Sequence, residues 1–333
     1  AWTSNTLLAR EEKAARALQG QDGVQRVFKL TCDDVAAEVP AYGKFVAEQV
    51  AKLGRHHPMV RTQYYSEEVD AEGGLFPAER LGLVLGTHPA QAMPSAGKIY
   101  VMTLDVAGEE ESPEHGMDLE NSVQAGGSAT RDATALTIAR VDLTTLNDPG
   151  KLLPTYKIVH RMVWVGVRHT AVYSQILNLA MSWHVKHLVC DATGVGAGLT
   201  SFLTRSLGEK VIPFVFNSKT KSDLGWAFLA LVDSGRLKTH ASVDGSRESQ
   251  DEYNRLFLQQ LEHCQYEIQP GPEKRIRWSV PDGTRDPGSG ALIHDDLVIG
   301  AAMLSLLDGK SWGVTGSAAV VQAHDPLEEM RKF

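Results

Sequence analysis

The run Ile99-Tyr100-Val101-Met102-Thr103-Leu104 is apolar along nearly its whole length and is followed directly by Asp105. A second run of this kind, His187-Leu188-Val189-Cys190, is followed by Asp191. Near-continuous apolar runs of this length are typical of strands buried inside an α/β sheet. The sequence therefore predicts two buried strands, each of which ends in an aspartate.

Further regular elements are predicted on both sides of these two strands. Strands are expected at 134–141, 156–165, 211–216 and 275–280. Helices are expected at 170–184, 199–207, 223–234, 251–263 and 295–307. Three strands in series, followed by alternating helices and strands, predict an α/β fold with a mixed β-sheet flanked by helices.

The first part of the chain has a different pattern. Helices are expected at 5–18, 42–53 and 77–85, and a strand is expected at 24–30, where apolar and polar residues alternate. The stretch 86–97 contains Pro89, Pro94 and Gly97, which is typical of a linker. We therefore divide the chain into residues 1–90, a main domain at 95–310 and a tail at 311–333.

The composition limits the class of protein. The chain has 333 residues, of which 43% are hydrophobic, and its 33 Lys and Arg against 41 Asp and Glu give a net charge of −8. This composition excludes collagen and wholesale disorder, and no apolar run approaches the roughly 20 residues that span a bilayer. Three widely spaced cysteines argue against a disulfide framework or a zinc ribbon and favour a reducing compartment. The bulk acidity by itself argues against a nucleic-acid partner.

The charge is distributed unevenly, which weakens that last argument. Seven acidic residues fall between 105 and 120, whereas residues 155–240 carry ten basic residues against four acidic ones, a balance of +6. The ten are Lys157, Arg161, Arg168, Lys186, Arg205, Lys210, Lys219, Lys221, Arg236 and Lys238. Lys274, Arg275 and Arg277 form a second basic group on an expected hairpin. These side chains could follow a duplex backbone, and Lys219 and Lys221 are the best individual candidates, although an evenly charged surface explains any single lysine equally well.

Several familiar motifs are rejected. Residues 92–99 lack the first Gly and the Ser or Thr of a phosphate-binding loop, and a strand follows where a helix is needed. Residues 194–199 have Leu199 in place of the third glycine of a dinucleotide-binding turn. The histidine pairs at 56–57 and at 184 and 187 have no further metal-ligating residues near them in the sequence.

The acidic residues at the ends of buried elements form the strongest candidate site. Asp105 and Asp191 end strands, and Asp295 and Asp296 begin the last helix. Sites in α/β sheets form beyond the carboxyl ends of strands, and carboxylates are preferred ligands of Mg²⁺ and Mn²⁺. Taken singly, Asp295 or Asp296 could be a helix cap and Asp191 could form an Asx turn. Taken together, the four carboxylates predict a metal site.

The segments that contain these residues resemble a known family. LDVAG at 104–108, VCDATGVG at 189–196 and HDD at 294–296 are similar, in order, to the three nuclease motifs of the large terminase subunit, the DNA-packaging motor of tailed bacteriophages. The resemblance covers about residues 98–309 and implies a ribonuclease H-like fold. Gly300 departs from the commoner pattern, in which an Ala or an acid stands at this position.

The resemblance also implies an activity. It implies an endonuclease that uses two Mg²⁺ or Mn²⁺ ions to cut concatemeric viral double-stranded DNA, with Asp105, Asp191, Asp295 and Asp296 as ligands. Asp296 is favoured as the main ligand of the last pair, and His294 fits a role in orienting water.

Residues 1–6 and the helix after them resemble the coupling motif and the tail of the terminase ATPase domain, so residues 1–90 are expected to be a small α/β tail without a Walker A loop. We therefore expect no ATP hydrolysis by this chain. The implied partners are double-stranded DNA, the portal protein and the small terminase subunit. The resemblance allows a homo-oligomer on the portal, in the cytoplasm of the bacterial host. Two alternatives remain: a resolvase- or transposase-like nuclease of the same fold, and a non-catalytic assembly module of the packaging motor.

Overall fold

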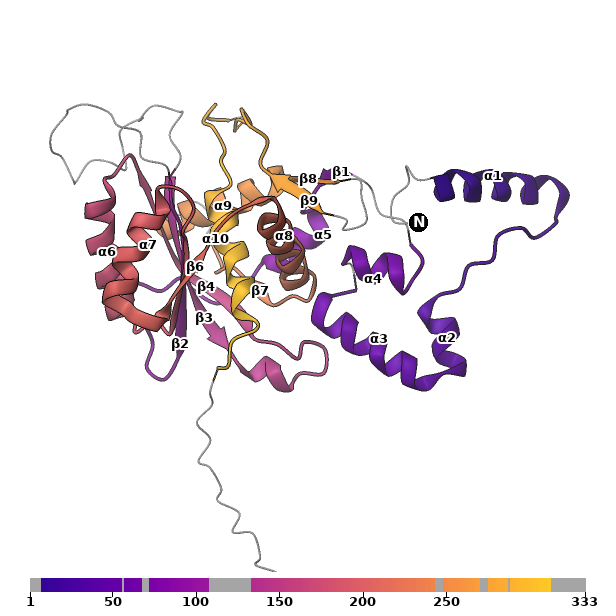
Figure 1. The fold of residues 1–333 in the computed structure, drawn as a ribbon, viewed down its shortest axis with the longest axis horizontal. Coiled ribbons are helices and arrows are strands. Elements are labelled where there is room, and N and C mark those ends of the chain that lie inside the picture. Colours follow the sequence, from indigo (N-terminus) through magenta and orange to yellow (C-terminus); the bar gives the residue numbers. More distant parts are fainter. Residues whose placement is uncertain are drawn as a thin grey trace, which may run out of the picture.

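The computed structural model describes residues 7–55, 57–67, 72–107, 133–242, 248–269, 275–286 and 288–312. Within these residues a mixed six-stranded sheet has the order β6-β5-β2-β3-β4-β7 (Figure 1). The strands are β2 (Ile99–Asp105), β3 (Ala133–Asp142), β4 (Thr155–Val165), β5 (His187–Asp191), β6 (Val211–Phe214) and β7 (Leu237–Lys238). Strand β3 is antiparallel to β2 and β4, whereas the pairs β2–β5, β5–β6 and β4–β7 are parallel. The mixed α/β sheet predicted from the sequence is confirmed.

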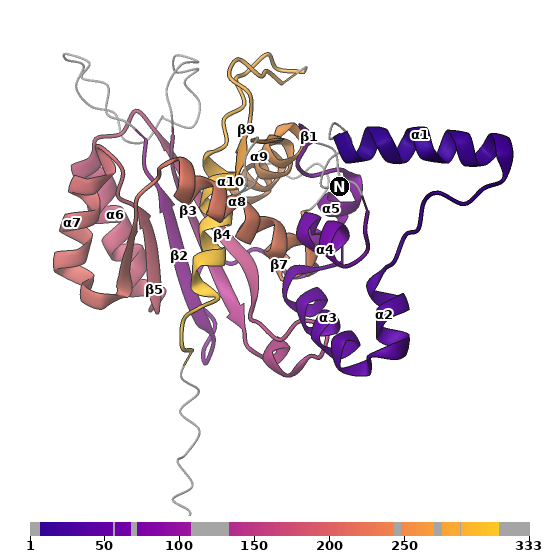
Figure 2. The ribbon, with the colours of Figure 1, turned by 45° about the vertical axis from the view of Figure 1, so that its right-hand side comes forward.

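Helices cover both faces of this sheet (Figure 2). One face carries α6 (His169–Ser182) and α7 (Gly196–Leu207), and the other carries α8 (Ser218–Asp233), α9 (Ser249–His263) and α10 (Asp296–Met303). Short 3₁₀ helices lie at Thr144–Asn147, Gly208–Lys210 and Leu304–Leu307. Each of the predicted helices after residue 165 is present, with boundaries that differ by a few residues.

The alternation of side chains along β2 assigns Asp105 to one face. Tyr100, Met102 and Leu104 belong to the apolar cluster under α6 and α7, whereas Val101 belongs to the cluster under α8, α9 and α10. Successive side chains of a strand point to opposite faces, so Thr103 and Asp105 share the face of Val101. Asp105 therefore lies on the same side of the sheet as α10.

A smaller sheet packs against α8. It has the order β1-β8-β9 and consists of β1 (Glu72–Gly74), β8 (Gln265–Ile268) and β9 (Ile276–Ser279), all antiparallel. The strand predicted at 275–280 is therefore present and forms a hairpin with β8. Trp278 on β9 is buried, and its Nε1 donates to the carbonyl oxygen of Lys221 at 2.8 Å.

The described N-terminal residues are helical. They form α1 (Leu7–Asp22), α2 (Cys32–Glu38), α3 (Pro40–Leu53), α4 (Pro58–Gln63) and, after β1, α5 (Ala78–Val84). The predicted strand at 24–30 is wrong: residues 23–31 have no regular structure, and Phe28 and Leu30 are 75% and 70% exposed. An alternating pattern forms a strand only where a neighbour supplies hydrogen bonds, and no strand among the described residues pairs with this segment. The described residues between 7 and 67 are therefore helical or irregular, and β1 is the strand described within residues 1–90.

Two segments of the N-terminal part, α5 and the connection between α3 and α4, contact α8. Nε and Nη2 of Arg80 donate to the two carboxylate oxygens of Asp233 at 2.7 and 3.0 Å, and the Asp233 side chain is fully buried. His57 is also buried, with Nε2 3.4 Å from the carbonyl oxygen of Trp226, and burial lowers the pKa of His57 to about 4. Gly54 allows the close approach, because a Cβ at this position would lie 2.4 Å from the carbonyl carbon of Asp233.

Two predictions from composition can be compared with the structure. Cys32, Cys190 and Cys264 are all buried free thiols, as expected without a disulfide framework. None of the helices in the described part of the chain is long and apolar enough to cross a membrane.

Candidate metal centre

The structure brings the predicted aspartates together from three segments that are far apart in the sequence. Asp105 and Asp191 are the last residues of β2 and β5, which are parallel neighbours with Leu104 opposite Cys190. Asp295 occupies the N-cap position of α10, and Asp296 is the first residue of that helix. Because parallel strands end at the same edge of a sheet, the two strand aspartates meet where α10 begins.

A cavity of about 230 Å³ opens at this edge. Three acidic side chains and a histidine line it, together with Lys221 of α8 and apolar residues; the four are Asp105, Asp295, Asp296 and His294. Asp191 is only 8% exposed and does not line this cavity, although its charge acts on Asp105. The cavity therefore collects the side chains of the first and third sequence motifs and is open to solvent.

The carboxylates interact electrostatically. The pKa of Asp105 is raised well above its usual value, first by burial and then by the negative charges of Asp296, Asp191 and Asp295, while Lys221 lowers it. Asp105 keeps some exposed area because it opens onto the cavity, but protein atoms surround its carboxyl group closely enough for desolvation to be the largest cause. Like charges that are partly withdrawn from water repel one another, and a bound cation would relieve that repulsion.

Asp191 is oriented by the turn that follows β5. Its Oδ1 accepts a hydrogen bond from the backbone N–H of Thr193 at 2.8 Å, and Thr200 Oγ1 donates to its carbonyl oxygen at 2.9 Å. Burial raises the pKa of Asp191, and the bonds from Thr193 oppose that rise. The Asx turn considered from the sequence is present. It fixes the orientation of the Asp191 carboxylate at the end of β5.

The chemistry of these donors fits a hard divalent cation, although they do not converge on one point. Asp carboxylates are preferred ligands of Mg²⁺ and Mn²⁺, and four of them meet at one edge. Among the residues that the structure describes, no group of three or more His, Cys, Asp or Glu is arranged to hold a metal ion. Binding to several of these carboxylates at once therefore requires their side chains to rotate towards one another.

Helix α10 is held against β2 and β3 at its middle. Oγ1 of Thr103, two residues before Asp105 on β2, donates to the carbonyl oxygen of Gly300 at 2.7 Å. A Cβ on Gly300 would lie 3.3 Å from Oγ1 of Thr137 on β3, which is tighter than most such contacts. The glycine that departs from the family pattern therefore allows the helix to lie close to the two strands. Sequence reasoning did not identify Thr103, because its partner is almost 200 residues further along the chain.

The two lysines predicted to contact DNA point in different directions. Lys221 lies on the cavity wall, with Nζ 3.9 Å from Oδ2 of Asp295 and 5.6 Å from the ring centroid of Trp278. Lys219 instead pairs with Asp223 at 2.6 Å, on an exposed part of α8. Residues two positions apart on a helix do not share a face, so the two lysines cannot act as one patch.

The second basic group is partly described. Arg277 is exposed on β9, and Nη1 of Arg275 donates to Oγ of Ser218 at 3.3 Å, which ties the hairpin to the start of α8. Lys274 lies outside the described residues, as does most of the acidic segment 105–120.

Two of the ten basic residues between 155 and 240 cannot contact DNA. Arg161 and Arg236 are 0% and 1% exposed. Arg161 donates to Asn254 and Thr239, and Arg236 donates to both carboxylate oxygens of Asp308 at 2.9 and 2.8 Å. The positive balance counted from the sequence therefore overstates the basic surface, because two of the charges lie inside the protein.

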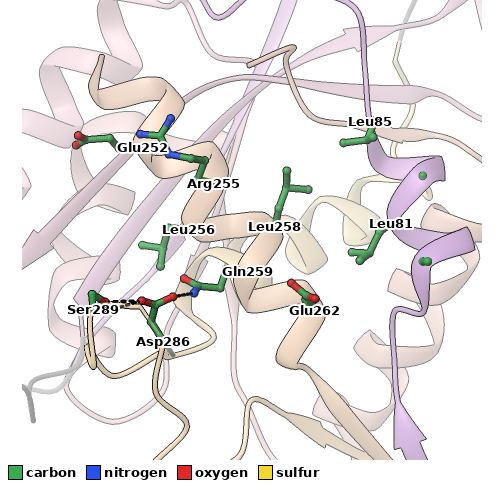
Figure 3. Close-up of a pocket in the computed structure, with 12 residues that line it drawn as sticks. Leu81, Leu85, Glu252, Arg255, Leu256, Leu258, Gln259, Glu262, Asp286 and Ser289 are labelled. Atoms are coloured by element: carbon green, nitrogen blue, oxygen red, sulfur yellow. Dashed lines mark hydrogen bonds between the residues drawn. The ribbon is translucent and has the colours of Figure 1, made fainter. Parts of the chain in front are cut away.

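Figure 3 shows a larger cavity, of about 850 Å³, that none of the four candidate aspartates lines. It separates α5 from α9 and is lined by leucines such as Leu81 and Leu256, with Glu252, Arg255 and Asp286 among its polar residues. None of the site residues predicted from the sequence lines it. The candidate site is therefore defined by its carboxylates, although a larger cavity lies elsewhere in the protein.

No family model matches the chain, and no curated protein matches it. Its structure is similar to that of a large terminase nuclease from the thermophilic phage G20c with bound magnesium, at 16% identity and a TM-score of 0.44, covering 70% of this chain and 96% of that one. The nuclease domain of the Thermus phage P74-26 large terminase is similar at 14% identity and a TM-score of 0.44, over 72% and 98%. The bacteriophage HK97 large terminase is similar at 12% identity and a TM-score of 0.41, over 92% of this chain and 61% of that one. All three belong to the family that the sequence motifs resemble.

Proposed function

We propose that the chain is a divalent-metal-dependent endonuclease that cuts concatemeric double-stranded viral DNA during genome packaging. The observation that carries the proposal is the group of four aspartates at one sheet edge, where burial, and after it the charges of the other three, raise the pKa of Asp105. The same aspartates lie in the three motifs that resemble the terminase nuclease. The ribonuclease H-like classification of the sheet is part of this proposal.

Asp105, Asp191 and Asp296 are the proposed ligands of Mg²⁺ or Mn²⁺, with Asp295 beside them. Two such ions, when bound, supply Lewis acidity at the scissile phosphate and lower the pKa of a water molecule. Asp296 is the proposed main ligand of its pair, and its carboxylate lines the cavity together with that of Asp105. Asp295 is the one whose Oδ2 lies near Lys221.

The remaining residues of the cavity have supporting roles in the proposal. His294 lies on the cavity wall, where its ring can hydrogen-bond a water molecule or a phosphate oxygen. Lys221 partly balances the carboxylates, because its positive charge lowers the pKa of Asp105. The exposed side chains of Lys219 and Arg277, with Arg275 beside them, are proposed to contact DNA phosphates. Lys221 at the cavity is proposed as a further DNA contact, and so is Lys274, from its sequence position.

The biological setting is proposed from the resemblance. The portal protein and the small terminase subunit are the proposed partners, a homo-oligomer on the portal is the proposed assembly, and the host cytoplasm is the proposed location. Residues 1–90 are proposed to be the end of an ATPase domain, and we expect no ATP turnover by this chain. Turnover above background would contradict that expectation.

A plasmid assay tests the nuclease proposal. Supercoiled plasmid incubated with Mn²⁺ should be nicked and linearised by the wild type and by Asp223→Ala, which removes an exposed carboxylate elsewhere on α8. Asp191→Ala should reduce cleavage to the level without protein, because it removes a proposed ligand while the side chains that line the cavity remain. Equal cleavage by Asp191→Ala and the wild type would contradict the site, and preference for four-way junctions over plain duplex would favour a resolvase.

A further inference from the structure

The first turn of α10 is capped by a residue of another helix. The backbone N–H groups of Leu297 and Val298 donate to Oε1 of Gln260 at 3.0 and 3.3 Å, and the Gln260 side chain, on α9, is only 2% exposed. These N–H groups belong to the second and third residues of the helix, which an N-cap side chain ordinarily pairs. Gln260 therefore has the role that the residue at the N-cap position, Asp295, would have in an isolated helix.

Asp295 has the right chemistry for a cap and does not act as one. Aspartate is among the most favoured N-cap residues, yet the carboxylate of Asp295 makes no capping hydrogen bond. The N–H groups that it would accept from are already paired with Gln260. Its carboxylate instead lines the cavity with those of Asp105 and Asp296.

The capping group is also uncharged, which affects the electrostatic repulsion among the nearby carboxylates. A glutamine carbonyl accepts hydrogen bonds without carrying a charge. A carboxylate at this place would add a fifth negative charge to a region where three aspartates already act on Asp105. Gln260 therefore satisfies the helix end without adding to the repulsion.

We propose that Gln260 is a positioning residue of the metal centre: by capping α10 from α9, it leaves the carboxylates of Asp295 and Asp296 available to a divalent cation. The inference rests on the proposed function, since it assumes that these carboxylates bind the ion. Removal of the Gln260 acceptor leaves two N–H groups unpaired. Asp295 is at the N-cap position, from which a side chain ordinarily accepts these hydrogen bonds, and its carboxylate then turns away from the cavity.

Direct Mn²⁺ binding by the full chain, measured by calorimetric titration after treatment with EDTA, tests this proposal. Gln260→Leu should weaken Mn²⁺ affinity about 10- to 100-fold, the range seen when residues that orient metal ligands are lost. The matched control is Gln250→Leu, on the same helix, which removes two hydrogen bonds to the backbone of Arg161 at 2.8 Å and should leave Mn²⁺ affinity unchanged. Gln260→Glu keeps the acceptor and should bind Mn²⁺ at least as tightly as the wild type, because its added negative charge destabilises the metal-free protein and is neutralised by the bound ion.

A second readout separates positioning from general stability. Asp295→Ala should change the melting temperature little in the wild type, where Asp295 is not a cap, and lower it clearly in Gln260→Leu, where Asp295 becomes one. Additive effects of the two substitutions on melting temperature would overturn the inference.

The outcomes of the titration are also distinct. Wild-type affinity in Gln260→Leu overturns the role of Gln260 while the nuclease proposal stands. Equal Mn²⁺ binding by the wild type and Asp191→Ala overturns the nuclease proposal and this inference with it. Should Gln260→Leu fail to fold, a tenfold loss of affinity in Gln260→Glu would overturn the inference by itself.

Discussion

The hydrogen bond from Thr103 to Gly300 joins the strand that carries Asp105 to the helix that carries Asp296, and Thr103→Val tests it. Oγ1 of Thr103 donates to the carbonyl oxygen of Gly300 at 2.7 Å, and the threonine is fully buried. Valine has nearly the same shape, but it places a methyl group where the hydroxyl group was. The substitution therefore removes the hydrogen bond and leaves the volume of the side chain almost unchanged.

The magnitude follows from this geometry. Loss of a buried hydrogen-bond donor that leaves its partner unsatisfied costs about 1–3 kcal/mol of unfolding free energy. A carbon atom approaches a carbonyl oxygen only to about 3.3 Å, so β2 and α10 must separate by roughly 0.6 Å beyond the present 2.7 Å. In domains somewhat smaller than this chain, each kcal/mol shifts the melting temperature by about 2–4 °C. We therefore expect Thr103→Val to melt several degrees below the wild type.

Thermal unfolding in EDTA, followed by calorimetry, measures this difference without any contribution from metal. Thr103→Ser is the matched control, because it keeps the donor and loses one methyl group, at a cost of about 0.8 kcal/mol. Thr103→Val should be less stable than Thr103→Ser and should also bind Mn²⁺ more weakly, since α10 has moved. A valine variant as stable as the wild type, or more stable than the serine variant, would refute the argument that this bond holds the helix.

Three further predictions concern pH, charge and DNA. His57 has a folded-state pKa of about 4, below the ordinary 6.5, so the protein should lose stability as pH falls from 6.5 through 4. Urea titrations should show that the wild type loses about 3 kcal/mol more unfolding free energy than His57→Gln on going to pH 4. Asp105 has a raised pKa, so its ionised form destabilises the fold as pH rises above 3.8. In EDTA, Asp105→Asn should become progressively more stable than the wild type with rising pH, and it should lose plasmid cleavage. Identical dependence of unfolding free energy on pH in the two proteins would contradict the repulsion. Arg277 is exposed on β9; Arg277→Ala should reduce the slope of log affinity for duplex DNA against log salt by about 1 in a fluorescence titration, and an unchanged slope would mean that it contacts no phosphate.

Some features of the fold could be read from the sequence because their causes are local. The strand 99–105 is apolar enough to be buried on both faces, and the helices after residue 165 show their periodicity directly. The segment 24–30 shows the limit of this reasoning. Its alternating pattern is genuine, but no described strand lies beside it, and its apolar side chains remain exposed.

Surface charge was less predictable than the strands. Arg161 and Arg236 were counted as part of a basic face, and both are buried, where one is held by amide and hydroxyl groups and the other by Asp308. Lys219 and Lys221 differ by two positions, and only Lys221 reaches the cavity. Burial of a charged side chain depends on partners from distant segments, which charge counts do not reveal.

By itself, the sequence determined that Asp105 and Asp191 end buried strands and that Asp295 and Asp296 begin a helix, because the residue following an apolar run is visible in one dimension. Only the tertiary structure decided how that helix is held. Gln260 caps its first turn, and the hydroxyl group of Thr103 donates a hydrogen bond to the carbonyl oxygen of Gly300 in its middle. Both contacts join segments whose register is set by the packing of the whole sheet and its helices. Strand ends are local properties of a chain, whereas the groups that orient a carboxylate come from wherever the fold places a matching donor or acceptor.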